Sequence, residues 1–178
     1  FVELLNISGG TIDLAGVCFT AGIRFDFPST ASLLLEAGKR LLLVGNKTAF
    51  ETKYGSGLPV AGEYSALSSL SNSGARLTLL DLGGAVIADF SYGDSLPWPP
   101  EADGGGYTLT RLTGAAGNSG DAALWRPSVS VGGSPGASDA LALSAYPDLM
   151  TYALISPPVP ILMADQRMAS WISSGLAP

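Results

Sequence analysis

Short apolar runs separated by turn-forming residues dominate the chain before residue 140. The strand-like runs are 1–7, 17–20, 23–27, 40–44, 76–81, 86–92, 107–112 and 124–126. Runs of this length, bounded by Gly, Pro, Asn, Asp and Ser, are typical of β-strands. Their regular spacing predicts an all-β fold built as an antiparallel β-sandwich.

The clearest hairpin joins residues 76–81 to residues 86–92. Gly83 and Gly84 lie between these runs, and we expect both to adopt the positive φ angles of a tight turn. Strict alternation on the returning strand places Val86, Ala88, Phe90 and Tyr92 on one face and Ile87, Asp89 and Ser91 on the other. We expect the core of the sandwich to contain Leu77, Leu79, Phe90, Leu109 and Trp125.

One short helix is predicted among the strands. Asn46 is suited to cap a helix over residues 48–54, and Gly55 is suited to end it. Nothing else before residue 138 supplies crossover helices, which argues against a parallel α/β architecture.

The pattern changes after the glycine-rich turn at residues 132–138. We therefore divide the chain into a domain of residues 1–138 and an apolar C-terminal extension of residues 139–178. The extension is too apolar to be typical of a disordered segment. We expect it to contain a helix opened by Pro147, followed by a short helix or a hairpin. It either folds back on the sandwich or pairs with a second copy in a homodimer, and three prolines between 157 and 160 exclude a membrane-spanning helix.

Composition removes most catalytic chemistries. The 178 residues include no histidine and one cysteine, Cys18, which excludes a Ser-His-Asp triad, the usual zinc sites and an intrachain disulfide. The net charge of −6, without a clustered basic face, argues against nucleic acid and anionic membranes as partners. A carboxylate-based hydrolase and a nucleic-acid-binding module remain the alternatives to a binding role. Because the glutamates are scattered outside any motif, we predict that the protein is not an enzyme.

An acidic loop is the best candidate binding site. Asp94, Glu101 and Asp103 lie there among prolines and glycines, together with Trp98. Carboxylates on a loop suit calcium, but the Asp-x-Asp-x-Asp spacing is missing, and the alternative is a turn in which Asp accepts backbone hydrogen bonds. Trp98 is either an exposed contact residue or a cap on one end of the core. No other cofactor is indicated.

Seven motifs follow one another in a characteristic order. They are Phe1-Val2-Glu3-Leu4-Leu5-Asn6, Ile12-Asp13-Leu14-Ala15-Gly16-Val17, Leu70-Ser71-Asn72-Ser73-Gly74 before Arg76-Leu77-Thr78-Leu79, Val86–Tyr92, Pro97-Trp98-Pro99 with Asp103-Gly104-Gly105-Gly106, Trp125-Arg126, and Gly133-Ser134-Pro135-Gly136. In this order they resemble a lamin-tail domain of the bacterial, secreted type over about residues 1–138. Val17 departs from the aromatic residue usual at that position.

The resemblance implies an immunoglobulin-like β-sandwich, in agreement with the strand pattern. It also implies a non-catalytic binding or spacer module of a larger secreted or cell-envelope bacterial protein, located outside the cytoplasm and contacting protein or carbohydrate. Nuclear lamins use such domains to bind proteins and DNA, but the acidic charge of this chain argues against the DNA role.

Overall fold

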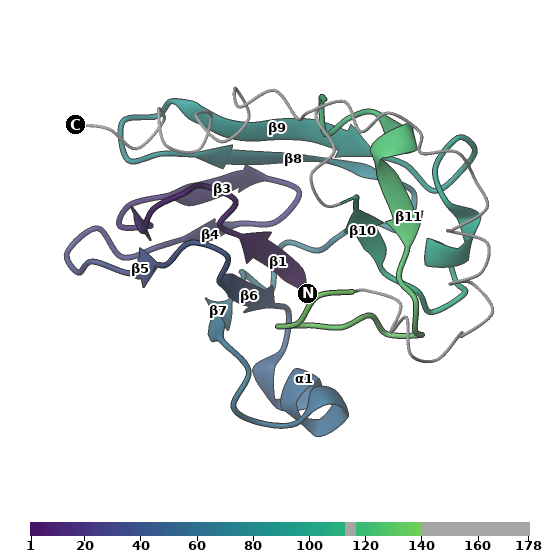
Figure 1. The fold of residues 1–178 in the computed structure, drawn as a ribbon, viewed down its shortest axis with the longest axis horizontal. Coiled ribbons are helices and arrows are strands. Elements are labelled where there is room, and N and C mark those ends of the chain that lie inside the picture. Colours follow the sequence, from purple (N-terminus) through teal and green to yellow (C-terminus); the bar gives the residue numbers. More distant parts are fainter. Residues whose placement is uncertain (113–116, 140–178) are drawn as a thin grey trace, which may run out of the picture.

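The computed structural model describes residues 1–112 and 117–139, which consist mainly of short strands and turns (Figure 1). The elements are β1 (Val2–Leu5), β2 (Ile12–Asp13), β3 (Cys18–Ala21), β4 (Phe25–Asp26), β5 (Leu34–Leu35), β6 (Arg40–Val44), α1 (Lys47–Tyr54), β7 (Val60–Glu63), β8 (Ala75–Leu80), β9 (Val86–Tyr92), η1 (Pro100–Ala102), β10 (Leu109–Arg111), η2 (Ala122–Leu124) and β11 (Trp125–Pro127). The predicted all-β class with one short α-helix is confirmed for these residues. The elements expected in the extension lie outside them.

Two sheets supply most of the core. A four-stranded sheet has the order β4-β3-β8-β9, and a three-stranded sheet has the order β1-β6-β7, while β2-β5 and β10-β11 form separate pairs. Figure 1 shows β8 and β9 along one side of the molecule and β6, β7 and α1 toward the other. The main core cluster joins Phe19 and Leu79 of the first sheet to Leu43 of the second, so the two sheets share one apolar interior.

The strand pairs are antiparallel, with one exception among the described residues. Strands β6 and β7 run parallel, which corrects the prediction of a purely antiparallel fold. Parallel neighbours need a connection of about a dozen residues or more, usually helical. Residues 45–59, which contain α1, provide that connection. The short helix that the sequence predicted is therefore a crossover element.

Local capping explains where α1 begins and ends. The Asn46 Oδ1 atom accepts a hydrogen bond from the Ala49 backbone N–H at 2.8 Å. At the other end, Gly55 has a φ of +85° and its N–H donates to the Glu51 carbonyl. Both predicted caps are confirmed. The helix is anchored through Phe50, which packs against Leu42 and Val44 of β6 in a second apolar cluster.

A β-bulge changes the predicted faces of β9. Leu79 pairs with Ala88 and Leu80 pairs with Val86, so Ile87 is an extra residue on the β9 side. As a result Ile87 is only 6% exposed and Val86 is 49% exposed, the reverse of strict alternation. The turn also differs from the prediction, because only the second of its two glycines, Gly84, has a positive φ. No helix in the described residues is long and apolar enough to cross a membrane.

Candidate binding cleft

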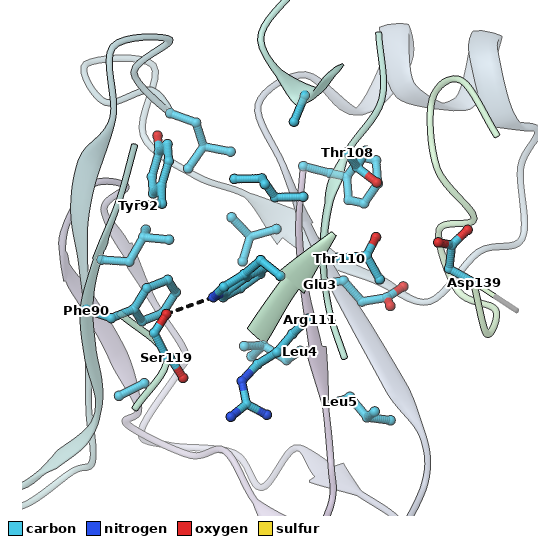
Figure 2. Close-up of a pocket in the computed structure, with 18 of the residues that line it drawn as sticks. Glu3, Leu4, Leu5, Phe90, Tyr92, Thr108, Thr110, Arg111, Ser119 and Asp139 are labelled. Carbon is cyan, nitrogen blue, oxygen red and sulfur yellow. Dashed lines mark hydrogen bonds between the residues drawn. The ribbon is translucent and has the colours of Figure 1, made fainter. Parts of the chain in front are cut away.

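A large cleft opens between the inner faces of β1 and β9, with β10 and β11 beside it (Figure 2). Its volume is 920 Å³. Most of its wall is aliphatic or aromatic. At about 30 Å³ per water molecule, the cleft has room for roughly 30 waters, whereas close-packed interiors leave few voids larger than one. The described residues therefore leave part of the space between the strands unfilled.

All five residues predicted for the core line this cleft: Leu77, Leu79, Phe90, Leu109 and Trp125. Of these, Leu79 is fully buried, while the other four are half-buried. The core prediction holds for Leu79, and Leu77 packs against the same cluster, whereas Phe90, Leu109 and Trp125 belong to neither core cluster. They keep exposed surface because the space that they face is open.

Stacked aromatic rings form one wall of the cleft. Phe90 and Trp125, which both line the cleft, lie with ring centroids 5.5 Å apart and an interplanar angle of 29°. The Trp98 ring, which does not line the cleft, lies tilted against Trp125 at a centroid distance of 6.0 Å. The Trp125 indole N–H donates to the Ser119 carbonyl at 2.8 Å, as the dashed line in Figure 2 shows. Because this polar atom is satisfied locally, the ring faces remain available for apolar contact.

The acidic loop lies at the edge of the cleft, but its carboxylates do not converge. Asp94 and Asp103 line the cleft, whereas Glu101 is exposed on η1. Within the described residues, no three acidic or cysteine side chains come close enough together to hold a metal ion. Asp94, Glu101 and Asp103 therefore do not form such a cluster.

Trp98 is half-buried and packs toward Trp125. A glycine precedes the loop for a steric reason: a Cβ on Gly93 would lie 2.9 Å from Cδ1 of Trp98, closer than real Cβ contacts allow. The backbone N–H of Trp98 also donates to the Ser95 carbonyl at 3.0 Å, which closes a turn. Trp98 thus packs toward Trp125 but is not itself among the residues that line the cleft.

Two buried or half-buried carboxylates hold the last described segment against the strands. Glu3 on β1 accepts the Gly136 N–H at 2.7 Å and the Arg40 Nε at 3.1 Å. Burial raises the pKa of the Glu3 carboxyl, and these two hydrogen bonds oppose that rise. Asp139, whose side chain is only 8% exposed, accepts Arg126 Nη1 at 2.7 Å and Ser134 Oγ at 3.0 Å.

Arg111 supplies a cationic group at the cleft that lacks a carboxylate partner among the described residues. Its Nη2 donates to the Gly117 carbonyl at 3.2 Å, but its buried Nε has no hydrogen-bond partner there. Desolvation lowers the pKa of this guanidinium. An unpaired buried donor is costly, so this site favours an additional acceptor, above all an anionic one.

Sequence reasoning did not identify Glu3, Arg111 or Asp139. The sequence did contain an indication of Asp139: Arg126 lies inside a short strand next to Trp125, and its guanidinium requires a hydrogen-bond acceptor. This indication does not specify which acidic residue provides it. Glu3 could not be found in this way, because its partner Gly136 is 133 positions away along the chain.

Other acidic residues with defined hydrogen bonds also stabilise turns and strand pairs. Asp13 accepts the backbone N–H groups of Ala15 and Leu33 at 3.0 Å and the Ser32 hydroxyl at 2.6 Å, and the Ser32 bond above all lowers the pKa of Asp13. Asp89 pairs with Arg76 on the neighbouring strand, which likewise lowers the pKa of Asp89.

Comparison of the chain with protein-family models, with curated proteins and with solved structures found no significant match in any of the three.

Proposed function

We propose that the chain is a non-catalytic binding and spacer module of a larger secreted or cell-envelope protein, and that its cleft takes up an apolar stretch of polypeptide. The proposal includes an immunoglobulin-like sandwich of the lamin-tail type. Two sheets around a common core support this fold, and the ordered sequence motifs support the family and the location outside the cytoplasm.

The observation that carries the binding role is the apolar cleft itself. A groove of 920 Å³ with aromatic and aliphatic walls suits apolar side chains, because burying them requires no polar partner. A sugar would bring many hydroxyl groups into the same space, and each buried hydroxyl needs a hydrogen bond. Protein is therefore the better partner of the two that the sequence suggested.

The acidic side chains support a non-catalytic role. Glu3 and Asp139 at the cleft are already engaged by Arg40 and Arg126. Burial, assisted by the neighbouring Asp26 carboxylate, raises the pKa of the Cys18 thiol and so disfavours the reactive thiolate.

Screening the full chain against a displayed library of random peptides and against a glycan array tests the proposal. We expect apolar peptides to be enriched and a Leu109→Asp variant to bind them at least ten times more weakly. Leu67→Asp is the matched control, since Leu67 is 98% exposed and lies outside the cleft. Circular dichroism establishes that each variant is folded. Binding of glycans instead of peptides, or peptide binding that survives the Leu109 change, would contradict the proposal.

A further inference from the structure

The last described residue, Asp139, lies in the wall of the cleft. The chain continues from it into residues 140–178. The Asp139 carboxylate is held by Arg126, Ser134 and the Val129 backbone N–H, and its carbonyl accepts a second hydrogen bond from Arg126. The point at which the remaining 39 residues begin is therefore fixed to the wall of the cleft.

The composition of residues 140–178 matches that of the cleft. This segment carries three charged residues, and its large apolar side chains are Leu141, Leu143, Tyr146, Leu149, Met150, Tyr152, Leu154, Ile155, Val159, Ile161, Leu162, Met163, Met168, Trp171, Ile172 and Leu176. Apolar side chains in such density need a surface to cover them. The cleft is an apolar surface directly beside the start of the segment, and its 920 Å³ can accept several of these side chains.

The charges are also complementary. The Arg111 Nε lacks an acceptor among the described residues, and two of the three charged residues in 140–178 are acidic, namely Asp148 and Asp165. A carboxylate from this segment would supply the missing acceptor and pair with the guanidinium.

We propose that residues 140–178 of the same chain are the polypeptide that fills the cleft. This inference rests on the proposed function and names the occupant. Because Asp139 anchors the segment at the cleft, binding within one chain proceeds at an effective concentration in the millimolar range, which disfavours a second copy at ordinary protein concentrations. The module then acts as a rigid junction to its own C-terminal segment, and an external peptide binds only by displacing that segment.

Paramagnetic relaxation in the full chain tests the placement. In a Cys18→Ser background, a nitroxide is attached to cysteine at Ser156→Cys, a polar position within the segment. We expect amide signals of Thr110 and Arg126, which line the cleft, to lose more than half of their intensity, whereas the exposed Leu67 remains sharp. Equal broadening of all three, or no broadening at the cleft, would overturn the proposal. A mixture of isotope-labelled chain and nitroxide-labelled chain identifies contact between copies, and cleft broadening in this mixture would also overturn it.

A competition experiment separates this inference from the proposed function. Replacing Leu149, Leu154 and Ile161 by Ser should release the segment, so that apolar library peptides bind at least ten times more tightly than to the wild-type chain. Replacing Ser144, Ser156 and Ser170 by Thr is the control and should leave the affinity unchanged. Equal peptide affinity in wild type and the triple Ser variant refutes the cis occupant and leaves the proposed function intact. If neither chain binds peptides, both proposals fail.

Discussion

Leu79 and Leu67 are the same residue type in opposite environments. Leu79 is 6% exposed in the core between the sheets, and Leu67 is 98% exposed. We expect Leu79→Ala to lower the free energy of unfolding by about 2–5 kcal/mol, because it removes buried atoms and leaves a cavity. Leu67→Ala should change it by less than about 0.5 kcal/mol. Urea unfolding measures both values, and similar losses at the two positions would contradict the assigned core.

The hydrogen bonds of the Asp13 carboxylate make the stability of the fold depend on pH. Its pKa in the folded state lies below the usual 3.8, chiefly because of the Ser32 hydroxyl. A lowered pKa contributes stability above about pH 4, and this contribution is lost as the pH falls through the folded-state value. Asp13→Asn should therefore be destabilising at pH 7, and its deficit should shrink by about pH 2.5.

Urea unfolding at the two pH values provides the measurement for Asp13. Ser32→Ala is the companion variant, since it removes the first hydrogen-bond donor and leaves the carboxylate in place. It should show a smaller deficit with the same dependence on pH. A deficit of Asp13→Asn that is equal at both pH values would show that the carboxylate charge contributes nothing.

At the scale of elements, the bulge in β9 predicts which of two neighbouring substitutions destabilises the protein more. Ile87 is buried and Val86 is about half exposed, so Ile87→Ala should cost about 2–5 kcal/mol and Val86→Ala less than about 1 kcal/mol. Thermal or urea unfolding of the two variants gives the comparison. Strict alternation without the bulge predicts the reverse order, so a larger loss at Val86 would disprove the pairing of Leu80 with Val86.

Elements defined by neighbouring residues could be predicted from the sequence, and elements defined by distant ones could not. The caps of α1 and the β8–β9 hairpin follow from local turn chemistry. In contrast, β2 and β5 are two-residue strands that exist only because Ile12 pairs with Leu35. The parallel alignment of β6 and β7 and the extra residue in β9 likewise depend on partner strands.

The same division applies to the candidate site. The common face of Ala88, Phe90 and Tyr92 was readable from alternation, and the cleft that they line was not. An open space results from the separation of β1 and β9, which no local pattern encodes. The sequence indicated the acidic loop, but it did not indicate that Asp94 lines this space while Glu101 is exposed outside it.

At the scale of the whole molecule, Asp139 ties the end of the described chain to β11. Asp139→Ala removes an acceptor from Arg126, Ser134 and Val129, and we expect a loss of about 2 kcal/mol, because hydrogen bonds to charged groups are the stronger kind. Asp139→Asn keeps one oxygen acceptor and should lose less. Calorimetric melting of the two variants tests this prediction, and a larger loss in Asn than in Ala would contradict it.

The pairing of the first strand has a kinetic consequence. Strand β1 is hydrogen-bonded to β6, and Glu3 on the same strand contacts Gly136. Contacts between residues so far apart close large loops before they gain any stabilisation, which slows folding into the millisecond-to-second range of β-rich domains. During synthesis, the ribosome must release Gly136 before β1 can complete its contacts. Strand β1 thus leaves the ribosome well before its last partner does, and it needs protection from wrong pairing until then.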